Sequence, residues 1–560
     1  MKPHPRNVVL PAFALIVASA SMIAVRAARA QNVAPPVGTQ AAQPAPTATP
    51  APASQLVNPC SADVKPAAPG APAWTGWSTT PENWRFQAAA QGGLSAAGAA
   101  QLRLKWAFGI PNVKIVRSQP GEFRGRVFVG ANDGTLYALD SSTGCTVWAT
   151  TASKPVRSGI AIGKAADADA IFFGDAGGNV YALAFDTGKL IWVVRAEAHP
   201  DATITGTPAY FKGRLYVPVS SGEEQSRRRN GYQCCTFRGS VVAMDAATGK
   251  TAWQGYMSSP AVAVESFQAG QGHGVFAPSG MAIWSAPTID AARNRIYVGT
   301  GDNYSEPGTK TSDAVVALDL KTGAILWSVQ FDKGDVYRID CGDPPREGCS
   351  PPTNPEFDLG ASPILVDLGH KKRALLLGQK SGLVYAVDPD SQGKLLWHAR
   401  AGAGGLLGGV QWGPATDGTN VYVAVSDLAF QGRGPDPAKG GGISAYRIRD
   451  GQLLWKTPPP GCGDRRPCSP AQSQAVTAIP GAVFSGSIDG HLRAYADADG
   501  RIIWDFDTAR DFDTVNKVAA HGGSLDVGGP IVVGGMVFVV SGYPGFGAMP
   551  GNVLLAFAAQ

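Results

Sequence analysis

Two pairs of neighbouring side chains in this sequence offer hard oxygen atoms of the kind that bind a calcium ion. Glu223 and Glu224 lie in the segment SSGEE, and Asp302 and Asn303 lie in the glycine-rich segment GTGDN. Carboxylate and amide oxygens are the ligands that Ca²⁺ prefers. A further acid, Asp358 in PEFDLG, could take a proton from a reacting hydroxyl group, although an unpaired Asp in a loop is usually solvated. Such chemistry requires a fold that gathers these groups.

The element that must position these residues is a β-hairpin that the chain repeats. In DAVVALDLKTGAILW, from Asp313 to Trp327, the apolar alternation predicts a strand, and the Asp-to-Gly segment predicts a tight turn before a second strand. Seven copies occur, ending at Trp148, Trp192, Trp253, Trp327, Trp397, Trp455 and Trp504. A spacing of roughly 45 to 75 residues, with another pair of short strands before most copies, is typical of four-stranded propeller blades.

The two ends of the repeated region supply an eighth blade. GNVLLAF near the C-terminus looks like a first hairpin strand without its turn and Trp, and LRLKWAF contains Trp106 with no strand before it. Pairing the strand at Leu554 with the strand at Leu104 would close the ring and remove its free edges. We therefore predict an all-β protein, an eight-bladed β-propeller over residues 71–560. Stacked β-sandwiches are the alternative, but they do not repeat one motif so regularly.

The N-terminal region predicts export. Residues 1–30 have a basic start, an apolar run from Val8 to Val25 and the cleavage site Ala28-Arg29-Ala30, as in a signal peptide. A retained membrane anchor is the alternative, which Pro11 disfavours. Residues 31–70 form an Ala- and Pro-rich segment that predicts a flexible tether. We expect a periplasmic or secreted protein with no membrane span in its mature form.

The charge balance gives no indication of a nucleic-acid partner. The chain has a net charge of +5, and residues 1–30 contain four basic residues and no acid, so the mature chain is near +1. Only 16% of residues are charged and 70 are glycine, a composition that suits a β protein with many tight turns.

Eight cysteines in an exported chain are expected to be oxidised. Cys341 with Cys349, and Cys462 with Cys468, are close enough in sequence to pair. Cys234 and Cys235 are adjacent and could form a vicinal disulfide or pair elsewhere, and the first alternative leaves Cys60 to pair with Cys145. No cysteine lies in Cys-x-x-Cys-His, so we expect no covalent haem.

The repeat, its number and the export signal together resemble the quinoprotein alcohol dehydrogenases, which use pyrroloquinoline quinone (PQQ). The hairpin looks like the tryptophan-docking motif of that family, and the resemblance runs from about Trp74 to the C-terminus. Within the family, the cysteine pair in CCTFRGSV, the segment GDNYS and the ending PGNVLLAF look most like the polyvinyl alcohol dehydrogenases.

The resemblance implies roles for individual residues. Trp284 matches the Trp that forms the floor under the quinone, and Asp302 matches a calcium-binding Asn eighteen residues later, with Asn303 beside it. Asp358 matches the catalytic aspartate. Members that use a lanthanide look to have an acid two residues further on, so Gly360 favours calcium.

Other matches concern cofactor contacts. Lys380 matches a basic residue that contacts the quinone oxygens, and Arg157 matches an Arg that pairs with a cofactor carboxylate. Since PQQ has three carboxylates, convergent cations are required, although a single Arg or Lys is most often a surface charge. The resemblance implies further cofactor contacts and a calcium-binding Glu: Thr205, Gln411, Trp412, Gly542 and Tyr543, and either Glu224 or Glu223.

Taken as a whole, the resemblance implies a mechanism. Ca²⁺ would polarise the quinone carbonyl, Asp358 would take the hydroxyl proton of a secondary alcohol, and hydride would pass to the quinone. The expected substrate is an alcohol or a polymer such as polyvinyl alcohol, and a separate periplasmic cytochrome c would accept the electrons. Two alternatives stay open: a quinoprotein for a small alcohol or sugar, and a cofactor-free propeller scaffold of the outer-membrane barrel-assembly type, which would need a lipobox that is absent here.

Overall fold

The computed structural model describes residues 47–560, apart from 52–54, 228, 230–231, 265–274, 338, 340–355 and 433. The predicted signal peptide, the start of the predicted tether and the predicted Cys341–Cys349 pair lie outside the described residues. Among the described residues, no helix is long and apolar enough to cross a membrane.

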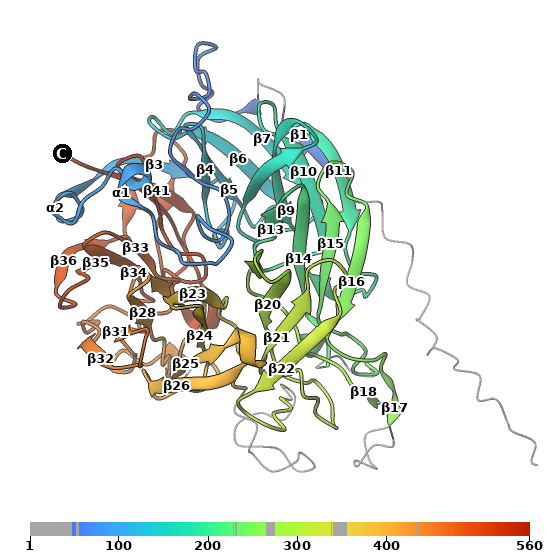
Figure 1. Cartoon of the computed structure of the whole chain (residues 1–560). Coiled ribbons are helices and arrows are strands. Elements are labelled where there is room, and N and C mark those ends of the chain that lie inside the picture. The colour runs from blue at the N-terminus through green and yellow to red at the C-terminus, as the bar shows by residue number, and fades with distance from the viewer. Residues whose placement is uncertain are drawn as a thin grey trace, which may run out of the picture. The chain divides into compact units, whose positions relative to one another are not determined.

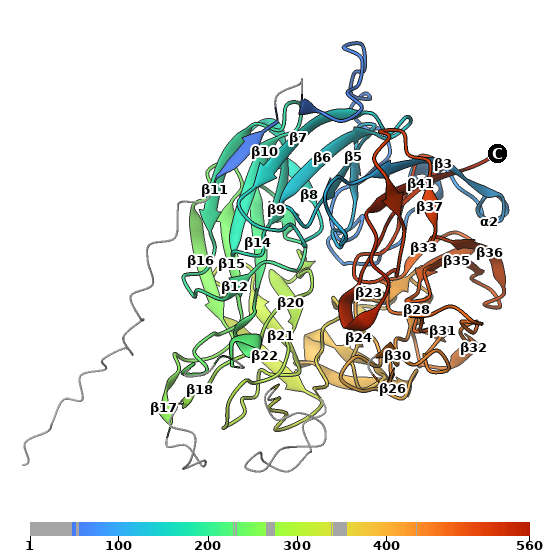
Figure 2. The ribbon, with the colours of Figure 1, turned by 180° about the vertical axis from the view of Figure 1, so that it is seen from behind.

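Eight antiparallel blades of four strands follow one another round a ring, as Figures 1 and 2 show from opposite sides. The first four are β4 (Gly121–Phe123), β5 (Arg126–Gly130), β6 (Thr135–Asp140) and β7 (Thr146–Ala152); β8 (Ala161–Ala165), β9 (Ala168–Gly174), β10 (Asn179–Ala184) and β11 (Leu190–Arg195); β13 (Ala209–Phe211), β14 (Arg214–Ser221), β15 (Ser240–Asp245) and β16 (Thr251–Tyr256); and β19 (Thr288–Asp290), β20 (Arg295–Gly299), β21 (Ala314–Asp319) and β22 (Ile325–Gln330).

The other four blades complete the ring. They are β23 (Ile364–Gly369), β24 (Lys372–Gly378), β25 (Leu383–Asp388) and β26 (Lys394–Arg400); β27 (Ala415–Thr416), β28 (Asn420–Ala424), β31 (Ile443–Arg447) and β32 (Leu453–Thr457); β33 (Thr477–Ile479), β34 (Ala482–Gly486), β35 (His491–Ala496) and β36 (Ile502–Asp507); and β39 (Ile531–Val533), β40 (Met536–Ser541), β41 (Val553–Ala559) and β3 (Leu102–Gly109).

Short elements lie between or beside the blades. The strands are β1 (Ala48–Pro50), β2 (Ala73–Trp74), β12 (Ala202–Thr203), β17 (Val262–Val264), β18 (Val275–Ala277), β29 (Phe430–Gln431), β30 (Gly434–Pro435), β37 (Asp511–Phe512) and β38 (Ala520–His521). The helical turns are α1 (Ala89–Gly92), α2 (Ala96–Ala99), α3 (Glu223–Ser226), η2 (Pro389–Ser391) and η3 (Gly545–Gly547).

The predicted closure of the ring is confirmed. Strand β3 from the N-terminal region pairs with β41 from the C-terminus, with Leu104 opposite Phe557 and Phe108 opposite Leu554. Figures 1 and 2 both show these two strands side by side. The eighth blade therefore combines the two ends of the repeated region.

The repeated Trp has the same cross-strand neighbour in every blade. It lies opposite an alanine of the neighbouring strand, as in Ala317 opposite Trp327 and, across the closure, Ala556 opposite Trp106. The six other pairs are Ala138–Trp148, Ala182–Trp192, Ala243–Trp253, Ala386–Trp397, Ala445–Trp455 and Ala494–Trp504. The small residue leaves room for the indole on that face of the sheet.

The same Trp also docks on the next blade. A Cβ at Gly323, whose φ is +73°, would collide with the ring of Trp253 from the preceding blade, so this turn requires glycine for its conformation and for its contact. Six indole N–H groups donate to a backbone carbonyl of the next blade at 2.8–3.1 Å: Trp106, Trp148, Trp192, Trp397, Trp455 and Trp504. This contact is the physical basis of the repeat.

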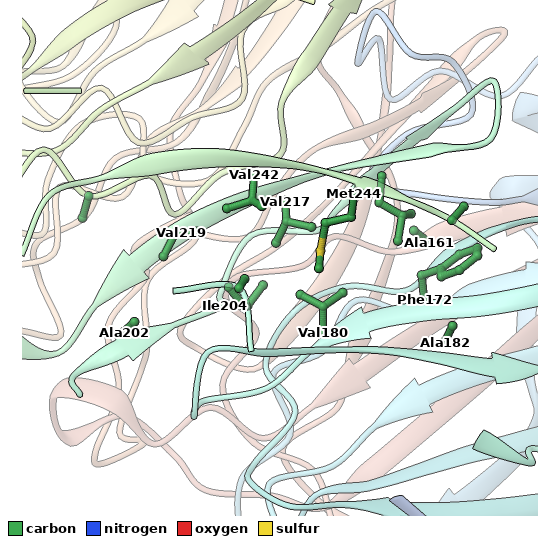
Figure 3. Packing of buried hydrophobic residues seen from close by; sticks show 14 of the residues in the cluster. Ala161, Phe172, Val180, Ala182, Ala202, Ile204, Val217, Val219, Val242 and Met244 are labelled. Carbon is green, nitrogen blue, oxygen red and sulfur yellow. The ribbon is translucent and has the colours of Figure 1, made fainter. Parts of the chain in front are cut away.

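Apolar side chains fill the space between neighbouring blades. Figure 3 shows Phe172 and Val180 of one blade packed against Val217, Val242 and Met244 of the next, all of them fully buried. The core is thus distributed round the ring, and each blade is stabilised by its two neighbours.

The described part of the segment predicted as a tether, residues 31–70, packs on the first blade. Strand β1 pairs with β7 and adds an outer strand to the first blade, with Ala48 opposite Ala152. Cys60 forms the expected disulfide with Cys145 in the same blade. Strand pairing and a covalent link together outweigh the flexible composition of this segment. Cys234–Cys235 and Cys462–Cys468 are also disulfides.

Candidate active site

The site is formed by loops at one end of the ring. In an antiparallel blade, the loop between the second and third strands opens at the same end as the loop that leads into the next blade. The predicted site residues occupy these two kinds of loop. Lys380 follows β24, Tyr543 follows β40, and Arg157 follows β7. The docking hairpins turn at the opposite end, so docking and site residues are separated in space.

A small pocket lies among these loops. Four predicted cofactor contacts line it: Arg157, Thr205, Trp284 and Trp412. The Trp284 and Trp412 rings meet edge to face, with centroids 4.9 Å apart, and the Arg157 guanidinium carbon lies 5.3 Å from the Trp412 ring centre. Flat aromatic surfaces beside a cation are suited to a planar anionic ligand.

Beside this pocket, Lys380 and two acids form a buried network. Lys380 Nζ lies 2.8 Å from Asp358 Oδ2 and 2.7 Å from Glu356 Oε1, and 5.6 Å from the centre of the Trp284 ring. The Asp302 backbone N–H donates to Asp358 Oδ1 at 3.0 Å. The structure thus brings the predicted base, the predicted quinone-contacting lysine and a predicted calcium ligand into direct contact.

The electrostatics of this network are dominated by negative charge. Burial alone would lower the pKa of Lys380, but the charges of Asp358 and Glu356 outweigh it and raise the pKa, so the lysine stays protonated. Burial, together with the charges of Asp358, Glu224 and Glu356, raises the pKa of Asp302 well above its usual range. The Asp302 carboxylate is therefore in a position that a bound cation would stabilise.

Glu223 and Glu224 are adjacent, but the structure places them in different surroundings. Glu223 is fully buried and accepts hydrogen bonds from Tyr232 and from the Thr236 and Phe237 N–H groups. Burial would raise its pKa, but hydrogen bonding and charge from His199, together with these N–H groups, lower it. Glu223 thus fixes the segment that follows Cys234–Cys235, whereas Glu224 is near enough to Asp302 to raise its pKa.

Asn303, the other candidate calcium ligand, is fully buried with its amide engaged. Its Oδ1 accepts from the Thr309 N–H and hydroxyl, and its Nδ2 donates to Ser312 Oγ and the Asp335 carbonyl. The side chain orders the 303–312 loop. Of the four predicted metal ligands, Glu224 and Asp302 are the two whose charges interact with each other.

The remaining predicted residues lie around the same loops. Gln411 donates to the Gly408 carbonyl at 3.1 Å, Tyr543 is buried, and the Gly542 carbonyl accepts from the Val116 N–H. A Cβ at Gly360 would collide with the six-membered ring of Trp284. The floor residue thus occupies the space that an acidic side chain at position 360 would need.

Sequence reasoning missed three residues of the site: Glu356, Arg117 and Asp526. Arg117 has its guanidinium carbon 5.9 Å from the Tyr543 ring centre, and burial together with the charge of Arg157 lowers its pKa. Asp526 accepts from Trp412 Nε1 at 2.6 Å and from Ser473 at 2.7 Å. No local motif marks Arg117 or Asp526. Glu356 stands in PEFDLG, two residues before Asp358, and that spacing was the available signal.

Several buried polar atoms of these loops have no hydrogen-bond partner among the described residues. They are Arg157 Nε, Thr205 Oγ1, Ser285 Oγ, Asp302 Oδ2 and Glu356 Oε2. Buried polar groups are normally satisfied, so such a concentration fits a polar ligand bound there. Within the same residues, no group of three or more His, Cys, Asp or Glu is arranged as a metal site by itself.

Comparison with known proteins agrees with this geometry. Residues 74–346 match the family described as glucose/ethanol/alcohol dehydrogenase, beta-propeller domain, under the heading PQQ, and residues 380–509 and 439–560 match outer membrane protein assembly factor BamB. The polyvinylalcohol dehydrogenase of Pseudomonas sp is 39% identical over 508 residues, covering 87% of this chain and 77% of that protein.

Two further comparisons extend this result. The polyvinylalcohol dehydrogenase of Sphingopyxis sp. (strain 113P3) is 39% identical over 509 residues, covering 87% of this chain and 76% of that protein. The solved structure of quinohemoprotein alcohol dehydrogenase ADHIIG from Pseudomonas putida HK5 has a TM-score of 0.63 at 17% identity, covering 87% of this chain and 80% of that one. At that identity, the structural likeness supports the propeller fold.

Proposed function

This chain belongs to the PQQ-dependent alcohol dehydrogenase family and is an alcohol oxidoreductase, and from this premise we propose that it oxidises the secondary alcohols of polyvinyl alcohol to ketones. The observation that carries the proposal is Asp358, which is held between Lys380 and the Asp302 N–H beside the pocket floor Trp284. The scaffold alternative is set aside, because the chain is an enzyme.

The residues of the pocket fit PQQ and a calcium ion. Arg157, with its unpartnered buried Nε, would hold a cofactor carboxylate, and Trp284 would lie against the ring system. When bound, PQQ supplies the two-electron acceptor for the hydride that leaves the carbinol carbon. Glu224 and Asp302 would hold Ca²⁺, which supplies Lewis acidity, and the absence of space for an acid at Gly360 supports calcium over a lanthanide.

The chain's own residues perform the proton transfer. Two donors, Lys380 Nζ and the Asp302 N–H, contact the two oxygens of the Asp358 carboxylate and fix its orientation. Asp358 then takes the hydroxyl proton as the carbinol carbon gives up its hydride, so the alcohol loses one proton and one hydride and becomes a ketone. Lys380 stays cationic throughout and balances the charge of the network.

The cellular setting belongs to the same proposal. We place the enzyme in the periplasm or outside the cell, with residues 1–30 removed as a signal peptide and residues 31–70 linking to the propeller. With no Cys-x-x-Cys-His in the sequence, no haem would be attached to the chain, and a separate periplasmic cytochrome c would take up the electrons.

Reconstitution tests this function. The purified chain is incubated with PQQ, Ca²⁺, both or neither, and reduction of an artificial dye is followed with polyvinyl alcohol and with pentane-2,4-diol as substrates. We expect dye reduction only with both additions, its loss with EDTA and its return with Ca²⁺, and no Soret absorption band. Equal turnover without PQQ or after metal removal would contradict the proposal. Turnover of the diol but not of the polymer would indicate a dehydrogenase of small alcohols.

A further inference from the structure

Exposed large apolar side chains occur in three parts of the described structure. Seven lie on the outer strands of the blades: Ile191, Ile325, Leu326, Leu395, Leu396, Leu453 and Leu454. Val262 lies on the β17–β18 hairpin, which projects from the ring in Figure 1. The other three, Leu406, Phe430 and Phe546, lie on loops at the end of the ring that contains the pocket, and we name these three the apolar wall.

The three loops that present the apolar wall contact one another. Asp427 accepts hydrogen bonds from the Ala403, Gly404 and Gly409 N–H groups and so fixes the loop that presents Leu406. Phe430 follows three residues later on β29, opposite Pro435 of β30. Strand β30 in turn contacts η3, which contains Phe546.

The wall is also continuous with the proposed active site at both of its ends. On one side, the Gly405 N–H donates to the Lys380 carbonyl at 3.1 Å, immediately before Leu406. On the other side, η3 follows Tyr543 directly, and a Cβ at Gly545 would collide with the Tyr543 ring. The loops of the wall are therefore next to Lys380 on one side and to Tyr543 on the other.

Phe546 has an unusual backbone conformation. Its φ of 56° and ψ of 34° lie in the left-handed region, which is rare for a bulky residue and is found preferentially at ligand-binding sites. The ring is 52% exposed, so burial of this side chain does not explain the conformation. The loop holds an aromatic side chain in solvent, where a binding partner can cover it.

We propose that the apolar wall binds the hydrocarbon backbone of the substrate chain, on either side of the carbinol that reacts. This inference rests on the proposed function, since its ligand is a polymer of alternating methylene and carbinol carbons. The wall side chains provide apolar contact for the methylene groups. The loop segments 402–409 and 545–550 contain no charged residue, in keeping with a neutral chain, whereas the loop that presents Phe430 contains Asp427, Arg433 and Asp436. A small alcohol would fill the pocket without reaching this surface.

The test compares Phe430→Ser, Phe546→Ser and the double variant with Leu453→Ser. Leu453 is a matched control, because it lies on β32 of the same blade as Phe430 and is 49% exposed against 48%. The holoenzymes are assayed with an artificial dye on polyvinyl alcohol and on pentane-2,4-diol. Binding to the polymer is measured separately, without turnover, by electrophoresis of the proteins through gels that contain it.

Each Phe variant is expected to lose roughly tenfold in kcat/KM on the polymer and to migrate faster than the parent through the polymer gel, while its kcat/KM on the diol stays within about twofold. Leu453→Ser should match the parent in all three measurements. Phe546→Gly adds a second signature, because glycine relieves the left-handed strain: polymer binding should fall while the thermal midpoint does not. A fold defect would lower both.

Two results separate this inference from the proposed function. A parent that oxidises the diol but neither oxidises nor binds the polymer overturns the proposed substrate and the wall together. A parent that oxidises the polymer, with Phe variants equal to it, overturns the wall alone. A third result would also contradict the inference. If the Phe variants lose rate only with a cytochrome c acceptor, and not with the dye, the apolar wall binds the electron acceptor and not the polymer.

Discussion

The docking hairpins and the pocket loops belong to the same blades, but the hairpins repeat one arrangement of residues and the loops do not. In the regular part of the blades a Trp lies opposite an Ala, and in the seven hairpin turns a Gly lies under the Trp of the preceding blade. In the loops the site residues follow no such repeat, and buried polar atoms such as Asp302 Oδ2 and Arg157 Nε lack partners among the described residues. Regular contacts stabilise the ring, and the irregular loops are left free to hold a ligand.

Two hairpins show that this division is not absolute. The indole N–H groups of Trp253 and Trp327 have no partner among the described residues, although both rings dock as the others do. Trp253 docks onto the blade β19–β22, whose loop contains Asp302, and Trp327 belongs to that blade. Packing is therefore the constant part of the docking contact, and the hydrogen bond is the variable part.

The largest effect is expected where the loops perform chemistry. Asp358→Asn keeps the shape of the side chain and removes the proton acceptor, so turnover should fall by roughly 10² to 10⁴ with PQQ still bound. Turnover is measured by dye reduction, and bound PQQ by absorption. The control is Asp367→Asn, at an exposed position on β23. Parental turnover in Asp358→Asn would mean that another carboxylate is the base.

A smaller effect is expected where the loops only bind. Arg157→Gln and Arg117→Gln should each weaken PQQ binding roughly 10- to 100-fold, because each removes a charged hydrogen-bond donor. Quenching of the fluorescence of Trp284 and Trp412 by added PQQ measures the affinity. Arg501→Gln, an exposed site on the outer part of a blade, should bind PQQ as the parent does. If Arg117→Gln also binds normally, that residue lies outside the cofactor site.

A change in a docking hairpin should affect stability and leave cofactor affinity unchanged. Gly323→Ala adds a Cβ that meets the Trp253 ring, and we expect a loss of about 1–3 kcal/mol beyond the strain of a positive φ. Gly213→Ala isolates that strain, because Gly213 has a φ of +76° with nothing near its Cβ position. Thermal unfolding compares the two. Equal thermal midpoints would show that the Trp253 ring moves to accommodate the added Cβ without loss of stability.

The last effect appears only as the pH changes and concerns Glu122 on β4, an exception within the regular blades because its Oε2 has no hydrogen-bond partner among the described residues. Burial raises the pKa of Glu122 to about 8, so between about pH 4.5 and 8 the folded chain holds a proton that the unfolded chain has lost. Stability should therefore fall as pH rises through this window, by up to about 1.4 kcal/mol per pH unit. Glu122→Gln should remove this slope, and identical pH profiles would show that Glu122 is not protonated.

The propeller was accessible from sequence because its determinants are local and repeated. The hairpin ending at Trp327 contains the alternation, the turn glycine and the Trp within fifteen residues, so each further copy confirms the pattern. The closure was accessible for the same reason, since β3 and β41 each hold half of a recognisable motif. The pairing of β1 with β7 could not be predicted from the sequence, because it depends on the free edge of a strand that lies about a hundred residues further along the chain.

The site was only partly accessible from sequence. Resemblance located Trp284 and Arg157, which line the pocket, and Lys380, which lies beside it. It could not separate Glu223 from Glu224, because the short helix α3 directs adjacent side chains to different neighbours. Arg117 was missed since its proximity to Tyr543 and Arg157 arises from ring closure and leaves no trace in local sequence.

The pairing of β3 with β41 also has a consequence for synthesis. The ribosome produces Leu102–Gly109 early and Val553–Ala559 last, so β3 must wait for nearly the whole chain before its neighbour exists. Until then, the nascent protein is an open arc whose two terminal sheets expose unpaired edges to other chains. The ring can therefore close only after translation is complete. A chain that ends before Val553 would keep unpaired strand edges, which favour aggregation and recognition by proteases and chaperones.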